Sequence, residues 1–358
     1  MNNPIPIKVL VVDDSALVRK AITQALARDR EIEVVGTAAD PYIARDQILA
    51  LKPDVLTLDL EMPRMDGLTF LRILQQHHPI PVIVISSLSQ KGSTLAFRAL
   101  EAGAVDVLGK PSSSYSIGLL GPQLALRIKA AFHARHRRPT PAGAPATPIN
   151  APVSAGAIDA RQVIAIGAST GGVEAIKMIL PRIPAATPGI VIVQHIPPHF
   201  SRMLAEQLDS VCPFTVKEAA DGDPVKPGLA LIAPGDYHLA IQRHTTGYVA
   251  KLSQSAPVHH CRPAVDVLLE SVANVAGSRA VGAILTGMGN DGAAGLLKMR
   301  QAGARTLAQD EESSIVYGMP RAALENGAAE QVVDLDHIPE AIFKALNRSA
   351  AGPSALAA

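Results

Sequence analysis

Three side chains in the second half of the chain have the types needed to hydrolyse an ester or an amide. Ser169 lies in GASTG, a match to the G-x-S-x-G pattern, His195 follows the apolar run IVIVQ, and Asp291 lies in GMGNDG. Serine is a poor nucleophile until an imidazole takes its proton, and a buried carboxylate fixes the imidazole tautomer. If the fold brings these residues together, Ser169 is the nucleophile, His195 the general base and Asp291 its orienting partner.

Each member of this set also has a structural interpretation. A glycine-rich turn between a strand and a helix is typical of phosphate and dinucleotide sites as well. A histidine after a strand often serves hydrogen bonding alone, and Asp291 in GNDG suits a turn. A nucleotide-binding module without hydrolysis is therefore the second interpretation, although no clear acidic ribose contact follows about 20 residues later. The joint pattern favours hydrolysis.

Carboxylates gather at the expected strand ends of the first half. Asp13 and Asp14 directly follow the run KVLVV, and Asp59 follows the run DVLTL. Because the carboxyl ends of parallel strands meet at one edge of a sheet, we expect the three side chains to converge. Clustered carboxylates repel one another unless a hard divalent cation lies among them, and Mg²⁺ suits such oxygen ligands. Aspartates after strands are also common helix caps.

A hydroxyl and an ammonium are expected at the same edge. Ser86 closes the run PVIVIS, and Lys110 follows the run AVDVL. Both groups can contact phosphate oxygens. Five residues at matching strand ends are far more specific than one aspartate pair, so the first half predicts a phosphate-handling site.

The elements that must position these residues alternate along the chain. Short apolar strands separated by helical patterns predict a doubly wound, flavodoxin-like parallel sheet of five strands in the first half. The expected strands are IKVLVV, EIEVV, DVLTLDL, PVIVIS and AVDVL, and the expected helices cover 15–28, 67–77, 94–102 and 116–138.

The second half restarts the alternation and predicts another α/β sheet. The chain order Ser, His, Asp differs from the order in α/β-hydrolases, so we expect a Rossmann-like doubly wound fold instead. The expected strands are QVIAIG, GIVIVQH, GLALIAP and AVGAILTG, and the expected helices cover 172–180, 202–209 and 295–302.

The amino-acid composition predicts the domain boundaries and excludes some classes of protein. A stretch rich in proline, alanine and small polar residues predicts a linker over 139–160, between a first domain at 1–138 and a second at 161–348, with a flexible tail at 349–358. The 33 basic and 32 acidic residues give a net charge of +1, which disfavours a nucleic-acid binder. Two cysteines and the lack of a signal peptide or an apolar span predict a cytoplasmic protein without direct membrane insertion.

The motifs of the first half resemble those of response-regulator receiver domains. These motifs are DD, DLEMPRMDG, SS and KP, in this order. The resemblance implies phosphorylation at Asp59 by a CheA-type histidine kinase. Asp13, Asp14 and Asp59 would hold Mg²⁺, and Ser86 and Lys110 would sense the phosphoryl group.

The whole chain resembles the CheB family of chemotaxis methylesterases. The motifs of the second half are GASTGG, QHIPP, APGDYH and LTGMGNDGAAG, and they follow a receiver. The resemblance implies phosphorylation-activated hydrolysis of glutamate γ-methyl esters on methyl-accepting chemoreceptors, and also glutamine deamidation, with no cofactor for the esterase. It makes Ser169, His195 and Asp291 the catalytic residues, with Thr170 and Met288 in the oxyanion region.

The chain departs from the family at several positions. Val107 stands where receivers usually carry an aromatic residue that reorients with Ser86. His259 and Cys261 stand where the methylesterases commonly have Asn and His, and Ala264 stands where they have Ser. Cysteine in a loop is usually inert packing, so we assign Cys261 no chemical role.

A complete phosphoacceptor site, a hydrolase site and a proline-rich connection on one chain suggest a regulatory hypothesis. The unphosphorylated receiver would cover Ser169, and the charge added at Asp59 would release it. Two other outputs are less economical. A catalytically idle docking module would not need the three catalytic residues, and a transcriptional output lacks a helix-turn-helix pair and a basic stripe.

Overall fold

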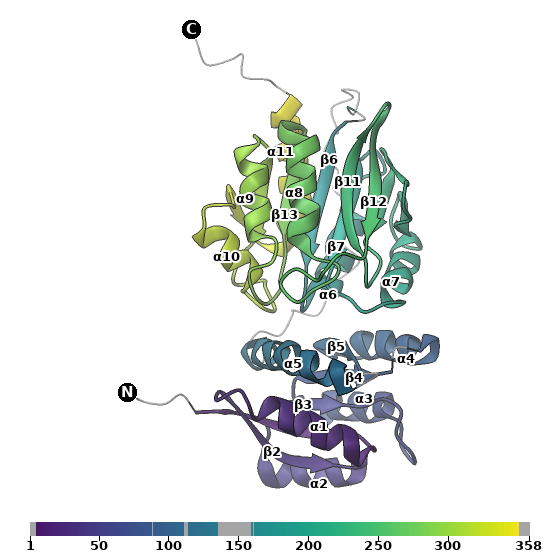
Figure 1. Ribbon diagram of the computed structural model, residues 1–358, viewed down its shortest axis with the longest axis vertical. Helices are drawn as coiled ribbons and strands as arrows, with labels where there is room; N and C mark the ends of the chain where they lie inside the picture. The colour runs from purple at the N-terminus through teal and green to yellow at the C-terminus, as the bar shows by residue number, and fades with distance from the viewer. Residues whose placement is uncertain (1–4, 88, 111–113, 135–158, 160, 351–358) are drawn as a thin grey trace. The chain divides into compact units, whose positions relative to one another are not determined.

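The computed structural model describes residues 5–87, 89–110, 114–134, 159 and 161–350. Within it the chain forms two compact units, Met1–Arg138 and Pro139–Ala358, each drawn in Figure 1. The predicted linker, apart from Asp159, and positions 351–358 of the predicted tail lie outside the described residues.

The first unit has the predicted five-stranded sheet. All four pairings are parallel, in the order β2-β1-β3-β4-β5, which confirms the predicted flavodoxin-like fold. Its strands are β1 (Ile7–Val12), β2 (Ile32–Ala38), β3 (Val55–Leu58), β4 (Val82–Ser86) and β5 (Asp106–Gly109). Its helices are α1 (Ala16–Leu26), α2 (Pro41–Leu51), α3 (Gly67–His77), α4 (Gln90–Glu101) and α5 (Ser114–Ala134).

Both faces of this sheet are buried, which explains its unbroken apolar runs. Val9 and Val11 of β1 pack with α1 and α5 in one core. Leu10 and Val12, which point to the opposite face, are also buried. The remaining helices, α2, α3 and α4, are left to cover that second face (Figure 1).

The second unit is built on seven parallel strands in the order β15-β14-β13-β6-β7-β10-β8. The predicted α/β class is therefore confirmed. The strands of this sheet are β6 (Val163–Ala168), β7 (Gly189–Gln194), β8 (Thr215–Glu218), β10 (Leu229–Ile232), β13 (Ala280–Ile284), β14 (Arg305–Gln309) and β15 (Gln331–Val333).

Helices cover this sheet on both sides. The core on one face joins alternate residues of β6, β7 and β10 to α8, α9 and α10, and α8 and α9 lie side by side in Figure 1. Ile164 and Ile166 point to the other face and are fully buried, which leaves that face to α6, α7 and α11. The helices are α6 (Gly172–Ile179), α7 (Phe200–Asp209), α8 (Val265–Val275), α9 (Ala293–Gln301), α10 (Met319–Glu325) and α11 (Ile338–Ala350), with short 3-10 turns at Leu180–Arg182, Gly277–Arg279 and Leu335–His337.

A small antiparallel sheet was not predicted. It consists of β11 (His238–His244) paired with β12 (Gly247–Ser253), which pairs in turn with β9 (Pro224–Val225). Leu239 and Ile241 join the main core, while the ends of both long strands are polar and exposed. Half-buried strands of this kind carry a weaker apolar signal than the buried runs of the main sheet.

Helix boundaries differ from the sequence-based expectation where a capping residue acts. The helix expected from Thr94 begins at Gln90, because the Ser89 hydroxyl accepts a hydrogen bond from the N–H of Gly92 at 3.0 Å. The helix α11 runs to Ala350, two residues past the expected end of the second domain. Among the described residues, no helix is both long enough and apolar enough to cross a membrane.

Helix α3 supplies a test of local stability. The carboxylate of Asp66 accepts from the Thr69 N–H at 2.9 Å and from the Thr69 hydroxyl at 2.8 Å. We expect Asp66→Ala to destabilise the start of this helix by about 1 kcal/mol, since one N-terminal N–H loses its partner. Amide hydrogen exchange across α3 measures the effect, with the exposed Gln76→Ala as the control. Equal exchange rates in the two variants would show that the cap contributes nothing.

Candidate active site

Three strand ends converge at the centre of the seven-stranded sheet. β6 lies between β7 and β13, and all three run parallel. Ser169 follows β6 and His195 follows β7, while Asp291 lies in the loop between β13 and α9. This is the topological switch point of the sheet, where doubly wound folds place their ligand sites. All three side chains are largely buried.

The three side chains form one continuous hydrogen-bonded row. Nδ1 of His195 lies 3.0 Å from Oγ of Ser169, and Nε2 lies 2.7 Å from Oδ2 of Asp291. An ionised carboxylate can only accept, so Nε2 carries a proton. In the neutral imidazole Nδ1 is then left to accept the serine hydroxyl. The two ring nitrogens therefore have the reverse of their roles in the familiar serine-protease arrangement.

The Asp291 carboxylate is held by the first turn of α8. Its Oδ2 accepts from the Val265 N–H at 2.7 Å and its Oδ1 accepts from the Asp266 N–H at 2.8 Å. Ala264, at the N-cap of α8, offers no side-chain hydrogen bond, so Asp291 takes that role from a distant loop. The helix dipole also favours a negative charge at this end.

Asp266, in α8, caps the neighbouring helix α9 in the same way. Its Oδ1 accepts from the Gly295 N–H at 2.6 Å, in the first turn of α9, whose N-cap residue Gly292 directly follows Asp291. Its Oδ2 lies 2.8 Å from Nε2 of His259. Burial, and then the charge of Asp291, raise the pKa of Asp266 above its ordinary value. The two helices thus exchange caps beside the serine and histidine.

The pKa shifts of His195 and Asp291 both favour the charged forms of the two groups. Burial lowers the pKa of His195, but the Cys261 sulfur and the Asp291 carboxylate together outweigh it, so the pKa lies above its ordinary value. Burial raises the pKa of Asp291, but the hydrogen bond and charge of His195 and the two α8 N–H groups bring it below its ordinary value. The geometry therefore favours an ionised Asp291 and stabilises an imidazolium.

Close backbone packing fixes the turn that presents Ser169. Gly171 has a left-handed backbone with φ 78°, which glycine adopts without strain. A Cβ on Gly287 would lie 2.7 Å from Cβ of Ser169 and still closer to the sulfur of Met319. The Ser169 N–H donates to the Thr286 carbonyl at 3.0 Å. The loop after β13 therefore packs directly on the serine.

A buried glutamine joins the serine and histidine segments. Nε2 of Gln194, at the end of β7, donates to the Ser169 carbonyl at 2.8 Å and to the His195 carbonyl at 3.2 Å. Because it links the two strand ends, its amide limits how far Ser169 and His195 can move apart. The sequence reasoning missed this residue, and its only sequence signal is its place just before His195.

The predicted oxyanion region lies around the same turn. The Thr170 carbonyl accepts from the Thr286 hydroxyl at 3.0 Å, which fixes the residue after the serine. The N–H of Met288 makes no hydrogen bond with the part of the chain that the structure describes. Donors of this kind can stabilise a developing oxyanion in a buried site.

The loop before α8 brings Cys261 to the same histidine. Its Sγ lies 3.6 Å from Nδ1 of His195, the nitrogen that also faces Ser169. The sequence reasoning treated this cysteine as packing, because nothing in the local sequence points to the histidine. Asp266 was missed as well, although an acidic residue in the first turn of a helix is an ordinary capping signal.

The receiver unit brings its predicted carboxylates together. Oxygen atoms of Asp13, Asp14 and Asp59 all lie within 4.8 Å of one another. The buried Oδ2 atoms of Asp13 and Asp59 face the Lys110 ammonium at 3.0 and 2.8 Å. Burial and the charge of Asp13 raise the pKa of Asp59, although Lys110 opposes them. This oxygen-only donor set fits Mg²⁺.

Ser86 lies one strand away from this cluster. It closes β4, and its carbonyl accepts from the Lys110 N–H at 2.7 Å. Its hydroxyl donates to the Gly92 carbonyl at 3.2 Å, in the first turn of α4. Val107, in the place of the usual aromatic residue, is buried in β5.

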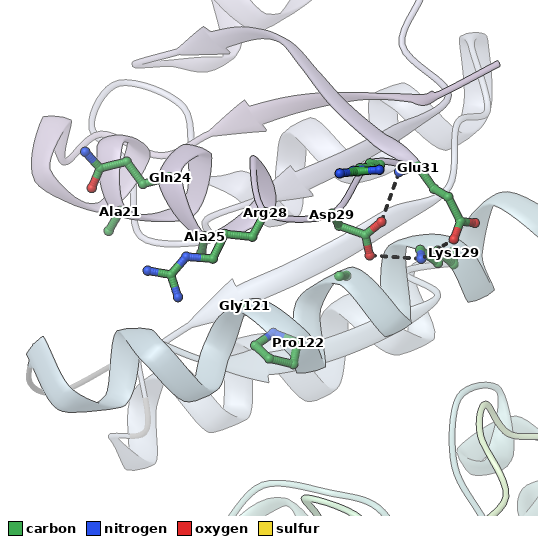
Figure 2. Close-up of a pocket in the computed structure, with 11 residues that line it drawn as sticks. Ala21, Gln24, Ala25, Arg28, Asp29, Glu31, Gly121, Pro122 and Lys129 are labelled. Atoms are coloured by element: carbon green, nitrogen blue, oxygen red, sulfur yellow. Dashed lines mark hydrogen bonds and ion pairs between the residues drawn. The ribbon is translucent and has the colours of Figure 1, made fainter. Parts of the chain in front are cut away.

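The receiver also has a groove of about 640 Å³ between α1 and α5, shown in Figure 2. One of its lining cations, Lys129, pairs with Asp29 and Glu31, both at 2.9 Å. None of the five predicted receiver residues lines it. The groove therefore adds nothing to the phosphate-handling chemistry.

The fold and the two sites define a class of protein, in which a receiver domain shares its chain with an α/β domain of serine-hydrolase type. Residues 9–117 match the model of the response regulator receiver domain, and residues 164–342 match that of the CheB methylesterase. The chain belongs to the CheB methylesterase family.

Relatives align over nearly the whole chain. The protein-glutamate methylesterase/protein-glutamine glutaminase 2 of Syntrophus aciditrophicus is 53% identical, and the alignment covers 94% of this chain and 98% of the relative. The protein of the same name from Pseudomonas aeruginosa is 49% identical, with 97% and 99% covered. The crystal structure of the Thermotoga maritima CheB methylesterase catalytic domain matches with a TM-score of 0.51 and 41% identity, covering 52% of this chain and 99% of that chain.

The ion pair between His195 and Asp291 predicts a pH-dependent stability. Because the folded pKa of His195 is raised, its contribution is complete below the ordinary value of 6.5 and is lost as the pH rises through the raised pKa. Because the folded pKa of Asp291 is lowered, its contribution is present above 3.8 and is lost in acid. We expect Asp291→Asn to destabilise the second unit most between these two pH values.

The measurement is the free energy of unfolding of the second unit against pH. The control is Asp334→Asn, which breaks an exposed pair with His337 and should change the free energy far less, because water screens this pair. A difference between wild type and Asp291→Asn that does not vary with pH would contradict the ion pair.

Proposed function

We propose that this protein hydrolyses glutamate γ-methyl esters on methyl-accepting chemoreceptors, releases methanol, and also deamidates receptor glutamines, in sensory adaptation or a related receptor pathway. The relatives are named for these two activities. The observation that carries the proposal is the row in which one imidazole lies 3.0 Å from the Ser169 hydroxyl and 2.7 Å from the Asp291 carboxylate. A nucleotide-binding module would have no use for that row.

The first half of the proposed reaction forms an acyl-enzyme. Oγ of Ser169 attacks the γ-carbonyl carbon of the substrate while Nδ1 of His195 takes its proton. Asp291, held by α8, keeps the ring oriented and stabilises the imidazolium. Backbone N–H groups in the region of Thr170 and Met288 receive the developing oxyanion. The C–O bond then breaks, and the His195 proton leaves with methanol.

The second half returns the enzyme to its starting state. His195, again neutral, takes a proton from water, and the resulting hydroxide attacks the acyl carbon. The Ser169 oxygen leaves and recovers its proton from the imidazolium. For a glutamine side chain the same steps apply, except that the first leaving group is ammonia. The protein groups in these steps are all present in the chain, and water supplies the second nucleophile.

In the receiver, we propose that Asp59 accepts a phosphoryl group from a CheA-type histidine kinase. Asp13, Asp14 and Asp59 would hold Mg²⁺, which supplies positive charge to the phosphoryl oxygens. Lys110, now paired with Asp13 and Asp59, would contact those oxygens, and the Ser86 hydroxyl would turn from Gly92 toward them. The phosphoryl group would bring about 1.5 to 2 negative charges in place of the single charge of the carboxylate, and this change in charge and size supports a repacking of this edge of the receiver.

The proposed domain boundaries follow from the separate sites for phosphorylation and for hydrolysis. We propose a regulatory domain at 1–138, a linker at 139–160 and a catalytic domain at 161–348, in a cytoplasmic protein that binds no nucleic acid. The presence of a phosphoacceptor domain and a hydrolase domain on one chain supports regulation in which the unphosphorylated receiver covers Ser169.

Loss of the nucleophile tests the esterase. We expect Ser169→Ala to lower the rate of methanol release from methylated receptor fragments by at least about 10⁴-fold, because no other side chain of the row can form the acyl-enzyme. The exposed Ser210→Ala, at the end of α7, is the matched control. Retention of most of the activity in Ser169→Ala would exclude the proposed nucleophile.

Loss of the phosphoacceptor tests the regulation. A small phosphodonor with Mg²⁺ is expected to stimulate methanol release by the wild type, and Asp59→Asn should abolish the stimulation while keeping the basal rate. Deletion of residues 1–138 is expected to raise the basal rate, because no receiver is left to cover the site. Stimulation that persists in Asp59→Asn would place the phosphoacceptor elsewhere, and a deletion that lowers the rate would rule out simple occlusion.

A further inference from the structure

The sulfur of Cys261 and the hydroxyl of Ser169 both face the same nitrogen. Nδ1 of His195 lies 3.6 Å from Sγ and 3.0 Å from Oγ. A thiol beside an imidazole that is itself oriented by a carboxylate has the arrangement of an activated nucleophile. Cys261 is also partly exposed, so small reagents can approach it.

The loop that carries Cys261 is fixed by hydrogen bonds. Backbone bonds of 2.8 and 3.1 Å join Cys261 to Val258 across a tight turn. The guanidinium of the next residue, Arg262, donates to Asp236 at 3.0 and 2.6 Å. The Ala264 N–H donates to Nδ1 of His238 at 3.2 Å. With both sides of the cysteine held, the sulfur keeps its place beside the histidine.

The other cysteine of the chain, Cys212, lies in an environment that makes its thiol unreactive. Burial, and then the charge of Asp209, raise the pKa of Cys212 to about 12, so its thiol stays protonated and unreactive. Cys261 instead faces His195, whose protonated form is stabilised by Asp291. A neighbouring imidazolium favours the thiolate, which is the form that reacts.

We propose that Cys261 is a modification site, at which hydroperoxides oxidise the sulfur and so switch off the Ser169 hydrolase. In this step the thiolate sulfur attacks the terminal peroxide oxygen, the S–O bond forms and the O–O bond breaks. The leaving alkoxide, or hydroxide from hydrogen peroxide, takes the proton held by His195. Sulfur is oxidised to a sulfenic acid and the peroxide is reduced to an alcohol or water.

The sulfenic acid would interfere with the base. Its added oxygen extends from a sulfur only 3.6 Å from Nδ1, where it can hydrogen-bond to the nitrogen that must accept the Ser169 proton. A thiol reductant restores the free cysteine and with it the activity. The loss of hydrolysis rests on the proposed function, whereas the reactivity of Cys261 does not.

Alkylation by iodoacetamide, followed by peptide mass spectrometry on the full-length protein, tests the reactivity alone. At neutral pH we expect Cys261 to react at least about tenfold faster than Cys212, because a larger share of it is thiolate. His195→Asn and Asp291→Asn should each slow the alkylation of Cys261 and leave Cys212 unchanged. Ser169→Ala, which has no esterase nucleophile, should keep the fast reaction.

Hydrogen peroxide tests the control of activity. Methanol release by the wild type and by Cys212→Ala should fall on treatment and return with a thiol reductant, while Cys261→Ser should keep its own untreated rate. If Cys261 reacts no faster than Cys212, or if neither His195→Asn nor Asp291→Asn slows it, the proposal is wrong. Equal inactivation of Cys261→Ser by peroxide would also overturn it. If the untreated wild type releases no methanol, the proposed function fails, and the alkylation rates still decide whether Cys261 is an activated thiol.

Discussion

The second unit is organised around one buried charge, the carboxylate of Asp291. A carboxylate away from water is costly unless each oxygen has a partner. Here the partners are two N–H groups of α8 and the ring of His195, at 2.7 to 2.8 Å. These bonds fix the direction of the imidazole, and the imidazole fixes the place where a nucleophile is useful. The arrangement therefore depends on where α8 begins.

The position at which α8 begins is set by packing against residues that are distant in the sequence. Val265, the first residue of α8, lies so close to Gly167 and Gly292 that a Cβ on either would be within 2.6 Å of its methyl groups. The helix end thus rests against the strand that leads to Ser169 and the turn that follows Asp291. In return Asp266 caps α9, so the two helices hold each other in register. A shift of one helix would misplace the hydrogen-bonded row of Ser169, His195 and Asp291.

Sequence patterns predicted the site residues that follow strands. They missed the residues that reach the site from other loops and helices. Ser169, His195 and Asp291 were predictable because parallel strands deliver their carboxyl ends to one edge. Cys261 lies in a loop and contacts His195, which is 66 residues away in the sequence. No local sequence pattern predicts such a contact. The same holds for the cap from Asp291 to α8, since its two members are separated by a strand and a helix. The polar hairpin of β11 and β12 was missed because its apolar signal is weak.

The two sites use buried carboxylates in opposite electrostatic settings. In the second unit Asp291 has a lowered pKa, because the His195 ring and two backbone donors outweigh its burial. In the receiver Asp59 has a raised pKa, because burial and the nearby Asp13 outweigh Lys110. A compensated carboxylate suits a group that must hold one orientation through a reaction cycle. An incompletely compensated one gains from an added cation and from a change in its own charge, which is what a phosphoacceptor requires.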